Sequence, residues 1–482
     1  MKNYLMAIDA GTGSVRAVLF DLKGNQIGCS QHEWTHNEDP RFPGSMDFDW
    51  KYNWELASGC VRNVLAETKI DPAEIAAIST TCMREGILLY DKDGNEIWAC
   101  ANVDARSNDE VAELIRMNPD LELELYKKSG QSYALNAIPR ILWVKNNMPD
   151  IYEKTAKIGM FNDWLIYKLT GVLAVEPSNG STTGLLDLQT RTWDTEIAAK
   201  CNLRTDIFPD ILECGSISGK VTAKGASETG LAEGTPVVVG GGDCQLGTIG
   251  VGACKPGEAA VFGGSFWQYE FNTESGKTDP YGRVRVNCHA VPGVWQYEAL
   301  AFKPGLVMRW FRDGFCQEEK RKAKEIGDDP YNLMNQAAEK IPAGCYGMMC
   351  CFSDIMNFIN WKHAAPTFTN FELLPEKFNK YTFYRSILEN TAMLVKGHIE
   401  LVKEATGNEP DKLIFAGGAS VSDLWSQILA DVTGKPVVTP VVKEATALGA
   451  AIIAGYGVGK IGLLVSECNV DNGNTSPACR VG

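Results

Sequence analysis

The sequence predicts an α/β protein built from two large domains, and three observations lead to this fold class. Its 482 residues exceed what one ordinary hydrophobic core organises and suit two domains. Short apolar runs typical of buried strands alternate with longer segments of helical periodicity. Each half also opens in the same way, with a strand, a turn of Asp and Gly, and a further strand. We therefore expect one domain over residues 1–233 and a second over residues 234–482.

The composition is that of a globular protein with reduced thiols. Hydrophobic residues make up 45% of the chain, and the net charge of −14 argues against non-specific binding to nucleic acid or anionic membranes. The fifteen cysteines include no C-x-x-C pair, so we expect them to be small core residues rather than zinc ligands. With neither a secretory signal nor an apolar run of about 18 residues, we expect a cytoplasmic protein.

The hairpin that opens the chain is the first candidate phosphate site. A strand over residues 4–8 leads to Asp9 and the turn Thr12-Gly13-Ser14, and a second strand carries Arg16. Backbone N–H groups and hydroxyls of such a turn can hold phosphates, and a guanidinium adds a charge-assisted contact. Asp9 would act through Mg²⁺, which bridges carboxylate and phosphate oxygens.

Two pairs of charged residues lie at the ends of predicted strands further along. Arg84 and Glu85 stand between strands over residues 75–79 and 87–90, and Asp104 and Arg106 follow an apolar stretch. Each acid can accept from, and each arginine donate to, the hydroxyls of a polyol. Surface ion pairs, which contribute little stability, explain the same residues equally well.

Two less specific stretches follow the charged pairs. Residues 142–169 have helical periodicity, and Trp143 and Trp164 are expected in the core. Residues 178–184 are polar and are expected to form a turn that faces a cleft.

The stretch around Asp243 is the most informative part of the chain. A buried strand over residues 237–239 is followed by three glycines and Asp243, and a second apolar run leads to Gly264 and Ser265. Glycines let a backbone approach a phosphate closely. An aspartate repels phosphate, but it can take the proton from a hydroxyl that attacks phosphorus, or hold a metal ion. A turn aspartate that caps a helix is the alternative.

The C-terminal half contains a predicted nucleotide platform. A glycine opens an amphipathic helix over residues 302–313, and residues 380–402 form a long core helix. A strand over residues 413–416 then leads through a double glycine into a helix, an arrangement that suits a nucleotide. An Ala-rich helix over residues 444–454 follows.

Seven stretches, in this order along the chain, resemble the FGGY family of carbohydrate kinases: MAIDAGTGSVRAVLFD, CMREG, VDARS, PVVVGGGDCQLG, AVFGGS, LIFAGGAS and EATALGAA. The resemblance covers about residues 4–460 and implies the actin/hexokinase-like (ribonuclease H-like) fold, an α/β fold of two domains. In that family ATP and sugar meet in the cleft between the domains. The resemblance thus implies that the N-terminal domain binds sugar and the C-terminal domain binds nucleotide.

The same resemblance implies roles for individual residues. Asp243 would be the general base, and Asp9 would lie on the Mg²⁺ side. The residues expected near the nucleotide are Thr12, Gly13, Ser14, Arg16, Gly264, Ser265, Gly305, Arg309, Gly418 and Ser422. Those expected to hold substrate hydroxyls are Arg84, Glu85, Asp104 and Arg106, together with Asp243.

Within the family, the chain is similar to bacterial kinases that phosphorylate autoinducer-2. The stretches that carry this similarity include MREGILLY, WACANVDAR, PSNGSTTGLLDL and FSDIMNFINWKHAAPTF. Those enzymes act on the terminal hydroxyl of open-chain 4,5-dihydroxypentane-2,3-dione, a quorum-sensing signal. Most sugar kinases of the family have G-E-R-x-P in place of residues 353–366, and Met83 stands where glycerol kinases have Gln.

Several alternatives remain open at this point. The same chemistry could act on a ketopentose, as in a xylulokinase, or on gluconate. A non-catalytic actin-like ATP-binding protein is an alternative of another class, although a filament or chaperone needs no polyol-binding pairs. Some family members respond to phosphotransferase-system regulatory proteins, so such a partner is possible. Residues 460–482 resemble a disordered tail rather than the last helical segment of the family.

Overall fold

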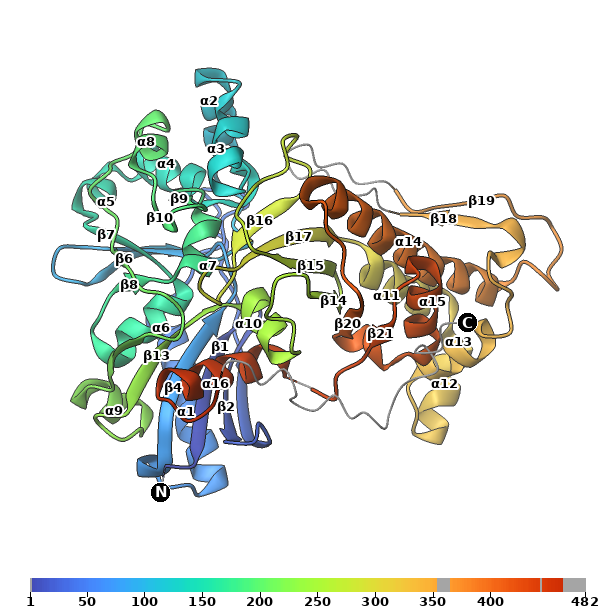
Figure 1. Ribbon diagram of the computed structural model, residues 1–482, viewed down its shortest axis with the longest axis horizontal. Helices are drawn as coiled ribbons and strands as arrows, with labels where there is room; N and C mark the ends of the chain where they lie inside the picture. Colours follow the sequence, from blue (N-terminus) through green and yellow to red (C-terminus); the bar gives the residue numbers. More distant parts are fainter. Residues whose placement is uncertain (1, 353–364, 443, 463–482) are drawn as a thin grey trace.

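Two six-stranded sheets, one in each half of the molecule, form the framework of the structure (Figure 1). This computed structural model describes residues 2–352, 365–442 and 444–462. The segment 353–364 and the C-terminal residues 463–482, on which two of our sequence predictions depend, lie outside the described residues.

The first sheet has the strand order β12-β13-β4-β1-β2-β3. Its strands are β1 (Tyr4–Ala10), β2 (Ser14–Asp21), β3 (Gln26–Glu33), β4 (Ile75–Cys82), β12 (Ile217–Lys220) and β13 (Pro236–Gly242). Strand β1 pairs antiparallel with β2 and parallel with β4. The helices packed around this sheet are α1 (Trp50–Thr68), α6 (Phe161–Thr170), α9 (Ala223–Thr229), α10 (Asp243–Gly250) and α16 (Ala445–Gly457). Large apolar side chains between the sheet, α1 and α6 form its core.

A smaller lobe extends the N-terminal half beyond this sheet. A three-stranded sheet of β5 (Ile87–Tyr90), β6 (Glu96–Cys100) and β7 (Lys157–Met160) is its centre. Its helices are α2 (Asn108–Met117), α3 (Leu121–Ser129), α4 (Ala137–Asn147), α5 (Pro149–Lys154), α7 (Pro177–Gly180) and α8 (Thr195–Lys200). Two short pairs complete it: β8 (Ala174–Val175) with β11 (Asp210–Ile211), and β9 (Leu186–Asp187) with β10 (Thr192–Trp193).

The second sheet has the order β16-β17-β15-β14-β20-β21. Its strands are β14 (Ala259–Gly263), β15 (Trp267–Thr273), β16 (Arg285–Cys288), β17 (Trp295–Ala301), β20 (Leu413–Ala416) and β21 (Val437–Val438). The helices of this half are α11 (Pro304–Phe315), α12 (Gln317–Ile326), α13 (Pro330–Ala338), α14 (Lys380–Thr406) and α15 (Asp423–Thr433). The hairpin of β18 (Met349–Cys351) and β19 (Thr367–Thr369) projects from it.

Helices α10 and α16 connect the two halves (Figure 1). They pack so closely that a Cβ atom on Gly250 would lie 1.9 Å from the carbonyl oxygen of Ala445. Strand β13 belongs to the first sheet and helix α16 packs against that sheet, although both follow residue 234 in the chain. The chain therefore crosses to the second sheet after α10 and returns to the first before α16.

Two sequence predictions of local structure are wrong. Residues 142–169 are not continuously helical, because β7 interrupts them by pairing with β5, a contact that periodicity within the segment cannot reveal. Residues 178–184, expected to be a turn that faces a cleft, are not an irregular turn. They form α7 and a 3₁₀ turn and are fully buried, because the hydroxyls donate to backbone oxygens, as from Thr182 Oγ1 to the carbonyl of Asn179 at 2.7 Å.

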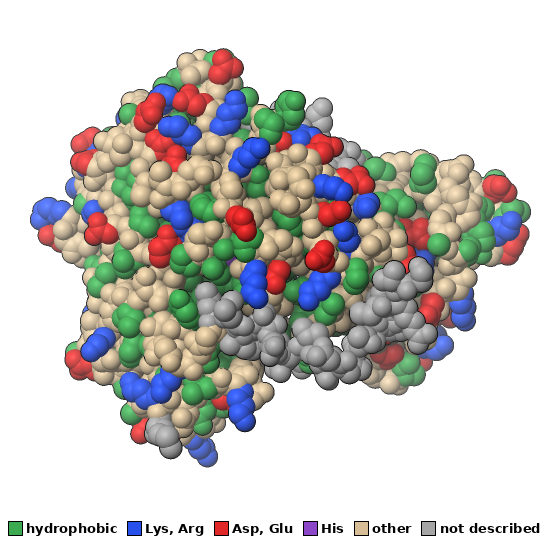
Figure 2. All heavy atoms as spheres, viewed as in Figure 1, with side chains coloured by type: hydrophobic (Ala, Val, Ile, Leu, Met, Phe, Trp, Pro, Cys, Tyr) green, Lys and Arg blue, Asp and Glu red, His purple; other side chains and the backbone are tan. Residues whose placement is uncertain are grey.

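The next features are the state of the cysteines, the length of apolar helices and the distribution of surface charge. All thirteen cysteines within the described residues are free thiols, and most are buried. No helix of the described part of the chain is long and apolar enough to cross a membrane. Acidic and basic side chains of the described residues are interspersed over the face drawn in Figure 2.

Candidate active site

Asp243 occupies the point where β13 ends and α10 begins, between the two halves of the molecule. The glycines before it are needed because a Cβ atom on Gly240 would lie 1.7 Å from the carbonyl oxygen of Thr80. The helix cap is Gly242, and Oδ1 of Asp243 accepts from the backbone N–H of Cys244 at 2.8 Å in the first turn of α10. Its side chain retains 36% of its exposure, so the carboxylate is open to a ligand. Surrounding protein raises the pKa of Asp243 by desolvation, against the lowering effect of Arg84.

Arg84 joins this carboxylate to the second sheet. Its Nε lies 3.4 Å from Oδ1 of Asp243, and its Nη1 forms an ion pair with Glu298 of β17. The side chain of Arg84 is only 6% exposed. The alternative of a surface ion pair is therefore wrong for Arg84, because a buried guanidinium must be paired to offset its desolvation.

Glu85 is paired in the same way with a residue of the second sheet. Its Oε1 lies 2.6 Å from Nη1 of Arg285, which is also 3.3 Å from Oε1 of Glu298. Glu85 has a φ of 66°, a conformation that is uncommon for residues other than glycine and that is found most often where function requires it. The carbonyl oxygen of Glu85 accepts from the guanidinium of Arg140, which holds this conformation.

Asp104 and Arg106 form a second buried pair. Oδ2 of Asp104 accepts from Nε of Arg106 at 2.8 Å and from the backbone N–H of Met46 at 2.6 Å. The guanidinium of Arg106 lies over the ring of Trp143, 4.9 Å from its centroid. The side chain of Asp104 is fully buried, so this pair is not on the surface, and its charges are already satisfied by protein.

Asp9 and Arg16 face each other across β1 and β2. Nε of Arg16 lies 3.0 Å from Oδ2 of Asp9, and its Nη1 forms an ion pair with Glu444. Burial raises the pKa of Asp9 to about 6, and the charges of Asp243 and Glu444 add to this rise while Arg16 opposes it. The negative charge of Asp243 thus contributes to the raised pKa of Asp9.

The turn that follows Asp9 is held in place by Asn102 and His36. Oγ1 of Thr12 accepts from Nδ2 of Asn102 at 2.9 Å, and the carbonyl oxygen of Thr12 lies 2.8 Å from Nε2 of His36. Thr12 and Gly13 are exposed, and Ser14 begins β2. The N–H and hydroxyl groups of this turn are therefore available to a ligand.

Six of the residues expected near the nucleotide line one cavity of about 600 Å³ in the second half. They are Gly264, Ser265, Gly305, Arg309, Gly418 and Ser422. Nη2 of Arg309 donates to Oγ of Ser265 at 3.2 Å, and Oγ of Ser422 accepts from the backbone N–H of Trp425 and caps α15.

Close backbone contacts shape the wall of this cavity. A Cβ atom on Gly305 would lie 2.0 Å from the carbonyl oxygen of Gly264, so α11 can begin at this point only with glycine there. Gly417 has a φ of +90°, and Gly418 has open space where a side chain would stand. Tyr331 and Tyr384 supply aromatic walls. A cavity of this size with exposed backbone and ring surfaces fits a nucleotide.

Sequence analysis did not identify three buried residues that hold the centre of the site together: Gln131, Arg285 and Glu298. Oε1 of Gln131 accepts from Nε of Arg285 at 2.8 Å. The available signal was a charged residue inside a predominantly apolar strand, as in WQYEALA, where Glu298 is fully buried.

Comparison with known proteins decides the family. The N-terminal domain of the FGGY family of carbohydrate kinases matches residues 4–250, and its C-terminal domain matches residues 272–458. The chain belongs to the FGGY family of carbohydrate kinases. As a member it is an ATP-dependent sugar kinase, and the alternative of a non-catalytic ATP-binding protein is wrong.

Curated relatives and solved structures agree with this assignment. The chain is 52% identical over 458 residues to the autoinducer-2 kinase of Yersinia enterocolitica serotype O:8 / biotype 1B, covering 95% of this chain and 87% of that protein. The autoinducer-2 kinase of Yersinia pestis bv. Antiqua (strain Angola) is also 52% identical, with 95% and 86% covered. The xylulose kinase structure from Rhodospirillum rubrum has a TM-score of 0.85 at 23% identity, covering 96% of this chain and 92% of that one. Plasmodium falciparum glycerol kinase with ADP gives 0.83 at 22% identity, with 97% and 92% covered. The two-domain α/β fold expected from the sequence is thereby confirmed.

Proposed function

We propose that this kinase transfers the γ-phosphoryl group of ATP to the terminal hydroxyl of autoinducer-2, in its open-chain form 4,5-dihydroxypentane-2,3-dione. The observation that carries the proposal is the 52% identity to autoinducer-2 kinases over 95% of the chain. The open carboxylate of Asp243, beside a buried guanidinium, supplies the chemistry that such a transfer needs.

Asp243 is the general base in this proposal. Its carboxylate takes the proton from the attacking hydroxyl as that oxygen forms its bond to phosphorus and ADP leaves. The raised pKa of Asp243, caused first by desolvation, makes it a better proton acceptor than an exposed aspartate. Arg84 contacts the carboxylate of Asp243. Together with Glu85, it is placed to bind the oxygen atoms of the substrate and to orient the hydroxyl toward Asp243.

The nucleotide would lie in the cavity lined by Gly264, Gly305 and Gly418, with its phosphates toward the turn at Thr12, Gly13 and Ser14. Asp9 would hold a Mg²⁺ ion, which would supply positive charge against the negative charge that develops during transfer. Asp9 fits a metal site, because its buried carboxylate faces a cluster that includes two further acids. Arg16 holds Asp9 in place and offers its charge to the phosphates.

Asp104 and Arg106 were predicted to hold substrate hydroxyls, and we propose a narrower role for them. Each charge is already paired, and the Asp104 side chain has no exposed surface. Direct contact would require the loss of a buried ion pair, which is costly. The pair is better placed to fix the wall of the sugar pocket, against the aromatic rings of Trp98 and Trp143.

An ADP-release assay against a substrate panel tests the proposed function. The panel contains dihydroxypentanedione, D-xylulose, D-ribulose, glycerol and gluconate. We expect kcat/KM for dihydroxypentanedione to exceed the others by at least about tenfold, or ~1.4 kcal/mol of transition-state preference. A ketopentose or gluconate that matches it would overturn the substrate while leaving the kinase chemistry intact. We expect the enzyme to act in the cytoplasm, where ATP is available. We also expect a regulatory protein of the phosphotransferase system as a partner.

A further inference from the structure

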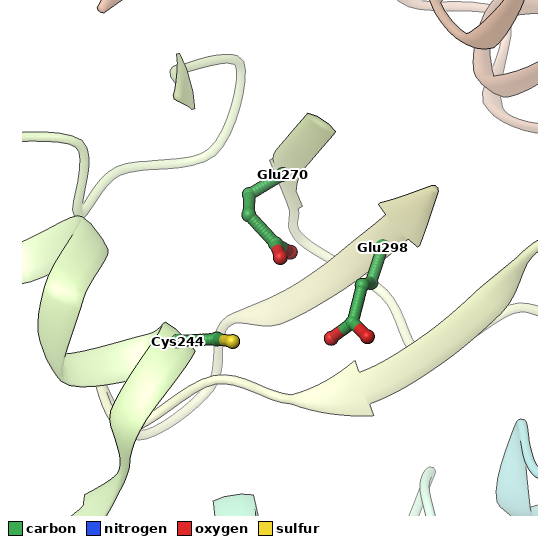
Figure 3. A group of neighbouring side chains, drawn as sticks. All are labelled: Cys244, Glu270 and Glu298. Carbon is green, nitrogen blue, oxygen red and sulfur yellow. The ribbon is translucent and has the colours of Figure 1, made fainter. Parts of the chain in front are cut away.

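Three side chains converge beside the base from three different elements. Cys244 comes from the first turn of α10, Glu270 from β15 and Glu298 from β17, and they point toward one another (Figure 3). The thiol sulfur and one oxygen of each carboxylate all lie within 4.8 Å of one another. Glu270 and Glu298 lie directly opposite each other on neighbouring strands. Two like charges in this position destabilise a sheet unless a positive charge offsets their repulsion.

Glu270 is the residue that requires an explanation. Its side chain is fully buried, and within the described part of the chain neither of its carboxylate oxygens has a hydrogen-bond partner. A buried carboxylate without partners is costly unless it keeps its proton or a cation compensates its charge, and burial raises the pKa of Glu270 well above its usual range. The amide nitrogen and oxygen of Gln268 lie 3.4 and 3.6 Å from the Cys244 sulfur, so a further oxygen donor stands next to the cluster.

Fully ionised, the acids at the centre of the site would outnumber its basic groups. Four carboxylates surround the centre of the site: Glu85, Asp243, Glu270 and Glu298. Two guanidinium groups, those of Arg84 and Arg285, face them. A divalent cation would balance this excess, whereas the two arginines leave it unbalanced when all four acids are ionised.

We propose that Cys244, Glu270 and Glu298 bind a divalent cation of borderline softness, such as Zn²⁺. A thiolate and carboxylate oxygens are ligands that Zn²⁺ accepts, and three protein ligands leave a position for water or substrate. The Cys244 thiol gives its proton to solvent when the metal–sulfur bond forms. The absence of C-x-x-C pairs does not exclude this site, because its ligands come from three separate elements.

Such a cation would act on catalysis through a shared ligand. Glu298 pairs with Arg84, and the same guanidinium lies on Asp243. A metal ion bound to Glu298 competes with Arg84 for that carboxylate. Arg84 then holds Asp243 less firmly in position. The expected consequence is inhibition by the cation, and this consequence rests on the proposed function, whereas metal binding itself does not.

Binding can be measured without any activity, by titrating the full chain with Co²⁺ and recording thiolate-to-metal absorption. We expect one saturable site. Its absorption band should be lost in Cys244→Ser, and its affinity for Co²⁺ should fall at least roughly tenfold in Glu270→Gln. Cys351→Ser, at an exposed thiol of β18, is the matched control and should leave the band unchanged. Thermal melting of each variant shows that it is folded. A band that survives in both Cys244→Ser and Glu270→Gln, or no saturable site, overturns the proposal.

Two further measurements locate the ion and its effect. Anomalous diffraction from crystals soaked in Zn²⁺ should place a peak between Cys244, Glu270 and Glu298. In the ADP-release assay with excess Mg²⁺, Zn²⁺ should lower kcat/KM of the wild type roughly tenfold and that of Glu270→Gln far less. A peak elsewhere overturns the site. Binding without inhibition overturns the inhibitory role alone, and an inactive wild type counts against the proposed function rather than against the metal site.

Discussion

The Nε atom of Arg84 lies 3.4 Å from Oδ1 of Asp243, while the other end of the same guanidinium pairs with Glu298. Arg84 belongs to the N-terminal half, and Glu298 belongs to the second sheet. The position of the expected base is therefore coupled to the contact between the two halves.

The first prediction concerns the base itself. Asp243→Asn removes the proton acceptor and keeps the size of the side chain, so nucleotide should still bind while kcat falls by ~10² to 10⁴. Isothermal titration with ADP and steady-state kinetics measure the two effects separately. Asp93→Asn, at an exposed turn, is the matched control and should behave as wild type. A kcat within about tenfold of wild type would exclude Asp243 as the base.

The second prediction concerns Arg84. Arg84→Ala should mainly raise KM for the sugar, because the contacts of this guanidinium are made in the ground state as well as in the transition state. Arg41→Ala is the control, since Arg41 forms an exposed ion pair with Asp39. An unchanged KM in a folded Arg84→Ala enzyme would limit Arg84 to holding the two halves together.

The third prediction separates two glycines of the same helix. Gly305→Ala should weaken nucleotide binding, because the new Cβ atom would lie 2.0 Å from the carbonyl oxygen of Gly264 and must push the cavity wall aside. Gly314→Ala, near the end of α11, meets no atom within 4 Å and should stabilise the helix by about 1 kcal/mol. ADP titration and thermal melting of both variants make the comparison. Equal ADP affinity in the two would show that the wall at Gly305 does not bind nucleotide.

Local sequence patterns predict the strands of this fold better than its buried polar contacts. The apolar runs at residues 87–90 and 413–416 coincide with β5 and β20, because a strand buried on both faces has a continuous apolar signature. Strand β7 was missed, since four residues become a strand only through pairing with β5. Asp243 could be singled out because its arrangement of strand, glycines and acid recurs at Asp9, but the residues that pair around it could not be predicted. Arg84 and Glu298 are 214 residues apart, and a pair formed at that separation leaves no pattern in either segment.

The last prediction concerns pH, because two carboxylates of the site must lose their protons for transfer. Burial raises the pKa of Asp9 to about 6, and desolvation also raises the pKa of Asp243. A proton on Asp9 removes the metal ligand, so kcat/KM should fall as the pH drops through about 6, and a proton on Asp243 removes the base and adds to the fall. Mg²⁺ competes with the proton at Asp9, and a higher Mg²⁺ concentration should therefore move this limb to lower pH. A profile that does not respond to Mg²⁺ would remove Asp9 from the metal site, and a profile that stays flat as the pH falls through about 6 would contradict the raised pKa of Asp9.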